Sequence, residues 1–402
     1  SDIYVPSAGN SHAIKNENRL NMAFDILSKA KRPIFLIGGG VNIADAGREL
    51  TMLAELMEIP VVTTIMGKGA IPTDNELYVG NVGIHGSYAA NSAVNNCDVL
   101  FSIGTRFNDR ITGNIHNFAP KATVIRIDID KTSISGKINI DFEIEADAKA
   151  AVNFLLKKAV CMDTLRWRNE INLWKNKNTA EQKDGVTPQK IISAVNNIFD
   201  DAVIVTDVGQ NQMWTAQFIE LNYNKKLLTS GGMGTMGYGL PAGIGAQIGN
   251  SDSIVIVISG DGGIQMNIQE LATAVINELP IIVCIMNNGY LGNVRQWQQM
   301  FHNKRYSGVC MQYRKICEKC CNKPHAQCPK YTPDFVKLAE SYGAKAIRVV
   351  CPNDIVKALI KAKKNRKTPT IIEFIIDREE NVLPIVPPGR AINDMLLNYD
   401  KK

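Results

Sequence analysis

The chain has 402 residues, of which 45% are hydrophobic and 21% are charged, and its formal net charge is +6. This length favours two domains of ordinary size, and no apolar run approaches the ~20 residues that cross a bilayer, which excludes an integral membrane protein. Lys and Arg are spread along the chain and form no basic tract for a nucleic acid. The polar start at Ser1 lacks the build of a signal peptide, so we expect a cytoplasmic protein with neither nucleic-acid nor membrane partners.

The first half of the chain alternates strand-like and helix-like stretches. Residues 31–40 are typical of a buried strand that runs into three glycines, and the apolar spacing over 44–59 predicts a helix. Further along come predicted strands at 60–64, 98–104 and 122–130 and a predicted helix at 88–95. Strands and helices that alternate in this way imply a doubly wound parallel sheet.

A second α/β series follows a polar stretch at about 157–183 that contains Trp167 and Trp174. Its predicted helices lie at 188–199, 267–278, 333–343 and 353–364, and its predicted strands at 202–209, 253–263, 280–288, 344–350 and 369–377. The expected organisation is a linker and helix at 1–30, a central domain at 31–160, a connector at 161–186, a second domain at 187–378 with a Cys-rich insert at 310–328, and a tail at 379–402. The fold class is therefore α/β, with two doubly wound parallel-sheet domains.

Two polar motifs end two strands of the second domain. Gly260-Asp261-Gly262 closes one strand, and Asn287-Asn288 closes the next one about 25 residues later. Strands of a parallel sheet end at one edge, where ligands of open α/β sheets bind. A carboxylate, an amide oxygen and a backbone carbonyl, completed by phosphate oxygens, suit Mg²⁺. The simpler alternative is two unrelated turns at strand ends.

The spacing of these motifs resembles that of the thiamine-diphosphate enzymes. The resemblance implies that Asp261 and Asn288 bind Mg²⁺ through their side chains and that Tyr290 binds it through its carbonyl. Six further segments, at 206–214, 229–246, 291–298, 305–307, 333–343 and 383–389, resemble the large catalytic subunit of acetolactate synthase. The family is identified by their order as well as by their sequence.

This resemblance implies a set of residues that hold thiamine diphosphate. They are Gly209, Gln210, Asn211, Gly234, Met236, Asp261, Gly262, Gly263, Asn288 and Tyr290. Met236 is implied to prop the cofactor in a bent form, and Trp297 to line the substrate channel, so these two are the catalytic candidates. Without the resemblance, both side chains would be assigned to core packing. Asn211 departs from the family, which usually has His there, so we expect a somewhat lower affinity for diphosphate.

In the central domain the resemblance implies a Rossmann-type fold that holds FAD in a structural rather than a redox role. The implied contacts are Gly38, Gly39, Gly40, Gly104, Arg106, Asp109, Arg110, Asp128, Ile129 and Asp147. A glycine-rich turn from strand to helix suits a dinucleotide, and arginines in a loop after a buried strand suit phosphate. A structural glycine turn and an ordinary surface loop are the alternatives.

The Cys-rich insert at 310–328 interrupts the resemblance. Cys317, Cys320, Cys321 and Cys328, with His325 nearby, offer soft ligands for zinc or an iron–sulfur cluster. Their irregular spacing leaves reduced thiols or a redox-sensing disulfide as the alternative.

The predicted function is the catalytic-subunit portion of an acetolactate synthase. Such an enzyme decarboxylates pyruvate and joins the product to pyruvate or to 2-oxobutanoate, in the biosynthesis of branched-chain amino acids. The family's general-base glutamate lies in a pyrimidine-binding domain that this sequence does not include, so we expect the chain alone to be inactive. The expected partners are further copies in a homo-oligomer, a separate pyrimidine-binding chain and a regulatory small subunit. The alternatives are another thiamine-diphosphate carboligase or decarboxylase, and a non-catalytic cofactor-binding remnant.

Overall fold

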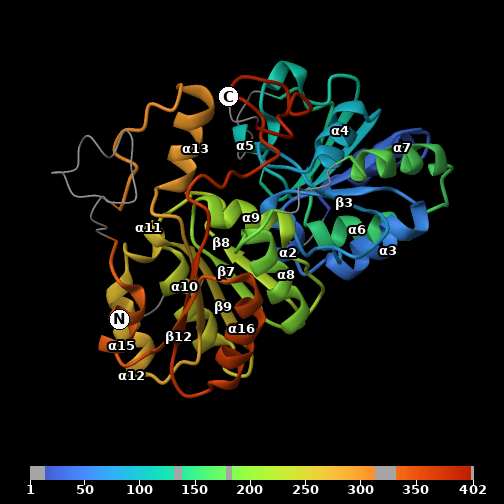
Figure 1. The fold of residues 1–402 in the computed structure, drawn as a ribbon. Coiled ribbons are helices and arrows are strands. Elements are labelled where there is room, and N and C mark those ends of the chain that lie inside the picture. Colours follow the sequence, from blue (N-terminus) through green and yellow to red (C-terminus); the bar gives the residue numbers. More distant parts are fainter. Residues whose placement is uncertain (1–13, 131–137, 178–182, 313–331, 400–402) are drawn as a thin grey trace. The chain divides into compact units, whose positions relative to one another are not determined.

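A computed structural model describes residues 14–130, 138–177, 183–312 and 332–399. The chain divides into two compact units, the first made of Ser1–Thr179 with Pro384–Leu397 and the second of Ala180–Leu383 with Asn398–Lys402. Each unit is built around a parallel six-stranded sheet (Figure 1). The prediction of two parallel-sheet α/β domains is therefore confirmed.

The sheet of the first unit has the strand order β3-β2-β1-β4-β5-β6. Its strands are β1 (Pro33–Ile37), β2 (Val61–Thr63), β3 (Tyr78–Asn81), β4 (Val99–Ile103), β5 (Thr123–Asp128) and β6 (Phe142–Glu145). Its helices are α1 (Glu17–Leu27), α2 (Gly39–Ile43), α3 (Gly47–Met57), α4 (Tyr88–Asn96), α5 (Asp109–Thr112), α6 (Ala148–Leu156) and α7 (Leu165–Lys175), with short 3₁₀ turns at Ile65–Gly67 and Ile115–Asn117. The helix predicted over 44–59 corresponds to α3, and Asp45, in a left-handed conformation (φ 49°), separates it from the short α2 that follows β1.

Both faces of this sheet are buried because successive side chains of a strand point to opposite faces. Along β1, Phe35 and Ile37 pack into one hydrophobic cluster, and Ile34 and Leu36 pack into another. The second cluster includes Trp167 of α7, which is 2% exposed and donates a hydrogen bond from Nε1 to the carbonyl of Pro33 (3.1 Å). The stretch predicted as a connector at 161–186 thus contains a helix that packs within the first unit.

The segment Pro384–Leu397 belongs to the first unit although it follows the second in the chain. Val386 donates its backbone N–H to the carbonyl of Ile84 (2.8 Å). The buried Asn91 donates its side-chain amide to the carbonyl of Ile392 (2.9 Å). These bonds link the C-terminal segment to the turn between β3 and α4 and to α4 itself.

The sheet of the second unit has the order β11-β12-β10-β9-β7-β8. Its strands are β7 (Val203–Thr206), β8 (Lys226–Thr229), β9 (Val255–Gly260), β10 (Ile282–Asn287), β11 (Lys345–Val349) and β12 (Thr370–Ile375). Its helices are α8 (Pro188–Ile198), α9 (Gln210–Phe218), α10 (Gly239–Gly249), α11 (Asp261–Ile264), α12 (Leu271–Ile276), α13 (Gly292–Phe301), α15 (Phe335–Ser341) and α16 (Ile355–Lys364), with 3₁₀ turns at Ile268–Glu270 and Pro352–Asp354. The strands β9 and β10 are buried along almost their whole length, as central strands of a parallel sheet should be.

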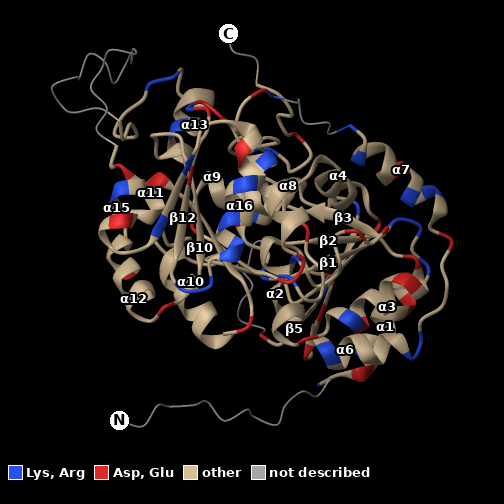
Figure 2. Cartoon of the chain, turned by 60° about the horizontal axis from the view of Figure 1, so that its bottom comes forward, with Lys and Arg blue, Asp and Glu red and all other residues tan. Residues whose placement is uncertain are grey.

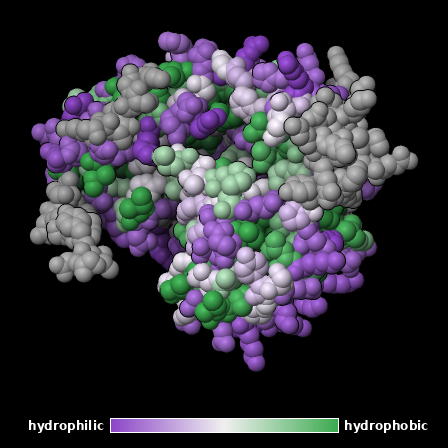
Figure 3. Space-filling model, turned by 90° about the vertical axis from the view of Figure 1, so that its left-hand side faces the viewer, coloured by the Kyte–Doolittle hydropathy of each residue, from purple (hydrophilic) through white to green (hydrophobic). Residues whose placement is uncertain are grey.

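Charged residues of both signs lie on helices and loops (Figure 2), and the central strands β1, β4, β9 and β10 contain none. On the face drawn in Figure 3, hydrophobic side chains form separate patches among hydrophilic ones. None of the helices in the described part of the chain is long and apolar enough to cross a membrane.

Candidate functional site

The strand order reverses between β1 and β4 in the first unit and between β7 and β9 in the second. Loops that leave the carboxyl ends of the two strands at such a point diverge to opposite sides and leave room for a ligand. Most of the predicted cofactor residues of both units follow strands at or beside these points. The two candidate sites are described separately below.

In the second unit, the turn after β9 and the turn after β10 meet through the carboxylate of Asp261. Its Oδ2 atom accepts a hydrogen bond from the backbone N–H of Gly289 (2.9 Å). Asn288 accepts one through Oδ1 from the backbone N–H of Tyr290 (3.1 Å). All three predicted metal ligands, Asp261, Asn288 and Tyr290, are therefore in two turns that contact each other, and each is at most 5% exposed.

The side chain of Met236 reaches the same turn. A Cβ atom added to Gly262 would lie 3.1 Å from Met236 Cε and 2.9 Å from Leu291 Cδ2, so both apolar side chains lie against the Gly262 backbone. Met236 is partly buried. The structure thus brings the predicted prop residue to the predicted metal turn.

Gly209 precedes helix α9 with φ 125°, a conformation that favours glycine. The next residue, Gln210, accepts a hydrogen bond through Oε1 from the side-chain amide of Asn288 (3.1 Å). Asn211 is 4% exposed, and its Oδ1 atom has no hydrogen-bond partner among the described residues. An orphaned buried oxygen at the start of α9 fits a site that a bound group completes.

Asp207 is a further organising residue that the sequence analysis did not single out. Its carboxylate, 1% exposed, accepts backbone N–H bonds from Gly237 (3.0 Å) and Gly239 (2.9 Å) and one from Val208 (2.8 Å). A Cβ atom on Gly263 would lie 2.5 Å from Asp207 Oδ1, which explains the glycine there. The signal was available: Asp207 is a carboxylate near the end of the strand predicted at 202–209, two residues before Gly209.

The electrostatics of Asp261 fit a cation site. Burial raises the pKa of Asp261 to about 7, although backbone N–H groups of Gly289 and Gly262 oppose the shift and Glu373 adds to it. A buried carboxylate disfavours its charged form until a cation neutralises it. Among the described residues no three His, Cys, Asp or Glu side chains gather to hold a metal by themselves. The arrangement suits a metal that takes one carboxylate, one amide and one carbonyl and receives its other ligands from a diphosphate.

Two predicted residues of the second unit lie apart from this cluster. Gly234 is exposed, with φ 64°, and no atom would lie within 4 Å of a Cβ added to it. Trp297 is partly buried on α13 and makes an edge-to-face contact with Phe301 at 5.5 Å between ring centres. Their predicted roles stay predictions.

In the first unit, the turn after β1 packs directly against the turn after β4. Gly40 donates its backbone N–H to the carbonyl of Gly104 (3.1 Å). A Cβ atom on Gly38 would lie 2.0 Å from the Gly104 carbonyl oxygen, and one on Gly39 would lie 3.0 Å from Met66 Cβ. These close contacts within the protein are sufficient to require glycine at these positions. They therefore agree with the alternative of a structural glycine turn, and they do not depend on a bound cofactor.

The side chains at this edge of the first unit include both exposed charges and buried orphans. Arg106, Asp109 and Arg110 are exposed. The buried atoms Thr105 Oγ1 and Asn108 Oδ1 have no hydrogen-bond partner among the described residues. Orphaned polar atoms beside exposed arginines fit a bound anionic group.

The acidic residues predicted to contact FAD have partners in the protein. Asp128, at the end of β5, pairs with the buried Arg126 (3.1 Å). Ile129 is 62% exposed. Asp147 accepts a hydrogen bond from the backbone N–H of Ala150 (2.9 Å) and caps α6. Their positions after β5 and β6 place all three at the carboxyl edge of the sheet.

Most of the Cys-rich insert, with Cys317, Cys320, Cys321 and Cys328, lies outside the described residues. Cys310, at its start, is partly buried, and its Sγ accepts a long hydrogen bond from Arg378 (3.7 Å). The possible zinc or iron–sulfur site stays a prediction.

Comparison with known proteins agrees with this geometry. Residues 207–374 match a family model described as the C-terminal TPP binding domain of thiamine pyrophosphate enzymes, and residues 20–155 match the central domain of the same enzymes. The chain therefore belongs to the thiamine pyrophosphate enzymes.

Within that class the chain is a homologue of acetolactate synthase large subunits. It is 39% identical over 391 residues to a probable acetolactate synthase large subunit of Methanocaldococcus jannaschii, an alignment that covers 94% of this chain and 63% of that protein. It is 39% identical to the acetolactate synthase large subunit of Cyanidium caldarium (92% and 62% covered) and 37% identical to that of Corynebacterium glutamicum (94% and 60%). The chain thus spans less than two thirds of the length of these relatives.

Proposed function

We propose that this chain supplies the cofactor-holding part of an acetolactate synthase catalytic subunit, with thiamine diphosphate and Mg²⁺ bound in the second unit. The observation that carries the proposal is the contact between the Asp261 carboxylate and the Asn288–Tyr290 turn through the Gly289 N–H. This contact supports a site made of one carboxylate, one amide and one backbone carbonyl beside the switch point, which is the set that a magnesium diphosphate needs. The homology to acetolactate synthase large subunits supports the choice of reaction.

In this proposal, the described side chains hold and orient the cofactor. Asp261 and Asn288 would bind Mg²⁺ through their side chains, and Tyr290 would do so through its carbonyl. Gly209 and Gln210, at the start of α9, would face the diphosphate, and the orphaned Oδ1 of Asn211 marks a polar position beside it. Thiamine diphosphate, when bound, supplies the electron sink for decarboxylating a 2-oxoacid.

Met236 would set the shape of the site. Its terminal methyl group lies against the backbone of Gly262, so the side chain reaches from the glycine-rich segment that precedes α10 to the metal turn. A bulky apolar group held in this way can support a bent ligand and exclude water from its concave side. Trp297 would line the approach of the acceptor 2-oxoacid.

The proposed reaction joins two 2-oxoacids. Pyruvate would be the donor, and pyruvate or 2-oxobutanoate the acceptor, so that the products are 2-acetolactate or 2-aceto-2-hydroxybutanoate. Homo-oligomers, a pyrimidine-binding chain and a regulatory small subunit are the proposed partners.

FAD is proposed as a structural ligand of the first unit. The buried orphans Thr105 Oγ1 and Asn108 Oδ1 and the exposed Arg106 and Arg110 support this assignment. The Gly38–Gly40 turn would allow the pyrophosphate to approach the backbone closely. Flavin absorbance of the purified chain would test it, and Arg110→Ala should reduce flavin retention.

Calorimetric titration with thiamine diphosphate tests the proposed function, with and without Mg²⁺ and with and without a separately expressed pyrimidine-binding domain. We expect binding that requires Mg²⁺ and is lost in Asp261→Asn. Acetolactate formation in the mixture is the second readout. Binding that is indifferent to Mg²⁺ and to Asp261→Asn would contradict the proposal.

A further inference from the structure

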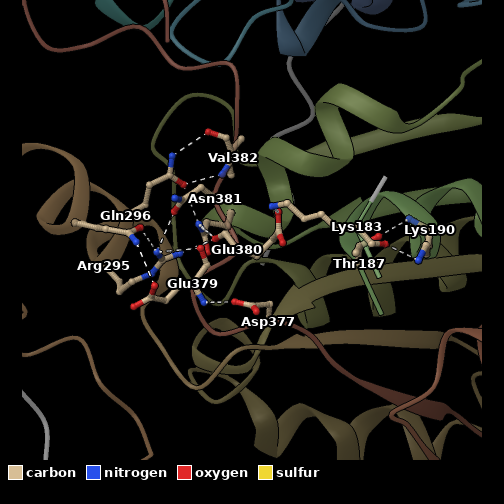
Figure 4. A network of polar contacts seen from close by, with 12 residues as sticks. Lys183, Thr187, Lys190, Arg295, Gln296, Asp377, Glu379, Glu380, Asn381 and Val382 are labelled. Carbon is tan, nitrogen blue, oxygen red and sulfur yellow. Dashed lines mark hydrogen bonds and ion pairs between the residues drawn. The ribbon is translucent and has the colours of Figure 1, made fainter. Parts of the chain in front are cut away.

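Buried side-chain amides are connected by hydrogen bonds that lead to the proposed metal turn. Gln296 of α13 is completely buried, and it pairs with the backbone of Val382 in both directions. Its Nε2 donates to the Val382 carbonyl (2.9 Å), and its Oε1 accepts from the Val382 N–H (2.8 Å) (Figure 4). Because a backbone N–H can only donate and a carbonyl can only accept, this pair fixes which end of the Gln296 amide is oxygen.

The orientation of the Gln296 amide determines the orientation of the Gln210 amide. Gln296 Oε1 also accepts a hydrogen bond from Gln210 Nε2 (2.9 Å), and the carbonyl of Glu380 accepts a second one from the same Nε2 (3.0 Å). A Gln210 amide turned the other way would place its oxygen against two acceptors. Its Oε1 therefore points to Asn288.

The Gln210 amide in turn favours one orientation of the Asn288 amide. Gln210 Oε1 accepts from Asn288 Nδ2 (3.1 Å), and Asn288 Oδ1 accepts from the N–H of Tyr290 (3.1 Å). The oxygen end of Asn288 consequently lies in the turn that contacts Asp261. A metal requires that end, since an amide nitrogen is not a magnesium ligand.

The loop Glu380–Val382, which binds these amides, is itself bound by two charged side chains. The buried Arg295 donates from Nη2 to the Glu380 carbonyl (2.5 Å) and from Nη1 to Asn381 Oδ1 (2.9 Å) (Figure 4). Lys183 forms an ion pair with Glu380 (2.7 Å). The backbone from Glu380 to Val382 is thus fixed on two sides.

We propose that Gln296 is a positioning residue, which sets the orientation of the Asn288 amide through Gln210 so that its oxygen faces the metal. We call Val382, Gln296, Gln210 and Asn288 the amide relay. The inference rests on the proposed function, because it assigns the relay a role at the proposed Mg²⁺ site. Gln296 itself is not among the residues proposed to hold the cofactor or the metal.

The first test measures the affinity of the chain for Mn²⁺ in the presence of thiamine diphosphate, by electron paramagnetic resonance of free Mn²⁺. Gln296→Met keeps the length of the side chain but removes its polarity, and it should weaken Mn²⁺ binding about ten-fold, as loss of an outer-shell partner of a metal ligand typically does. Gln247→Met is the matched control. Gln247 is 2% exposed and donates to the carbonyls of Asn250, Ser251 and Ser253 at the opposite edge of the sheet, so its loss should reduce stability and leave Mn²⁺ affinity unchanged.

A double-mutant cycle separates orientation from general loosening. An aspartate at position 288 has oxygen at both ends and no orientation to set, so Gln296→Met should not weaken Mn²⁺ binding in the Asn288→Asp background. The same ten-fold loss in both backgrounds would overturn the proposal. So would unchanged affinity in Gln296→Met alone.

A metal-free readout keeps this inference distinct from the proposed function. In protein without metal or cofactor, the NMR resonances of the Asn288 side-chain amide should shift or broaden in Gln296→Met. They should stay unchanged in Gln247→Met. Unchanged Asn288 resonances in Gln296→Met would overturn the relay even where Mn²⁺ binds. If the wild-type chain binds no metal with thiamine diphosphate, the proposed function fails, and the role of Gln296 toward the metal fails with it, whatever the resonances show.

Discussion

The two units have parallel sheets of the same size but use their switch points differently. In the first unit, backbone meets backbone: Gly38 and Gly40 pack on Gly104, and the charged side chains Arg106 and Arg110 are exposed. In the second unit, buried side chains meet: the carboxylates of Asp207 and Asp261 and the amides of the relay bind the surrounding turns. The switch point of the first unit therefore depends on glycines, which have no side chain. The switch point of the second unit depends on particular polar side chains.

The largest expected effect comes from adding one carbon atom to the first unit. Gly38→Ala would place Cβ 2.0 Å from the Gly104 carbonyl oxygen, so we expect the free energy of unfolding to fall by more than about 3 kcal/mol. Urea denaturation measures this. Gly245→Ala is the control, because no atom lies within 4 Å of its Cβ position on α10, and alanine there should stabilise by up to about 1 kcal/mol. Equal stability of Gly38→Ala and wild type would contradict the close packing.

A change of polarity without a change of size should have its main effect in the second unit. We expect Asp261→Asn to weaken Mg²⁺-dependent binding of thiamine diphosphate about 100-fold, which corresponds to about 2.7 kcal/mol. Stability without ligand should stay equal or rise, because the substitution removes a buried charge. Calorimetry and thermal denaturation measure the two effects, and Asp252→Asn, at an exposed position, is the matched control. Parallel loss of stability and affinity would indicate a structural role only.

Asp207→Asn tests whether the glycine-rich segment depends on one carboxylate. The amide has one oxygen in place of two, so the N–H of Gly237 or that of Gly239 should lose its acceptor, at a cost of about 2 kcal/mol. Faster hydrogen exchange at the amides of these two glycines would locate the effect. Exchange rates equal to those of the wild type would show that the carboxylate does not organise the segment.

A further expected effect is a pH dependence in the first unit. Burial lowers the pKa of His85 to about 4, with Arg110 adding to the shift and the Pro384 carbonyl opposing it. Below pH 6.5 the unfolded chain binds a proton that folded His85 does not, so the stability that this residue contributes is lost as the pH falls from about 6.5 towards 4. The unfolding temperature should therefore fall less over this range in His85→Gln than in wild type. His116→Gln, at an exposed position, should follow the wild type.

The interior of the fold could be predicted from the sequence, but part of its periphery could not. The central strands β1, β4, β9 and β10 are almost entirely apolar because both of their faces are buried. The strands that were not predicted are β3, β6 and β8, all of them at sheet edges. Each has only one fully buried residue, so the apolar pattern that identifies a strand is weak there.

The candidate site of the second unit also has a part that could be predicted from the sequence and a part that could not. Asp261 and Asn288 follow predicted strands of one sheet, so their proximity could be inferred from the rule that parallel strands end at one edge. The amide relay could not be inferred in this way, because Gln296 contacts Gln210 and Val382, each 86 positions away along the chain. The spacing of residues in a sequence does not show which glutamine of a helix faces a distant loop.

The return of Pro384–Leu397 to the first unit has a consequence for how the protein is made. The first unit lacks the partners of Ile84, Asn91 and Asn114 until residues 386–392 have been synthesised. During translation the second unit is therefore almost complete before the first can close, although the first begins emerging from the ribosome earlier. A fragment that stops at Thr179 would be expected to expose the turn between β3 and α4, and a protease should cut it there until the missing segment is supplied as a separate peptide.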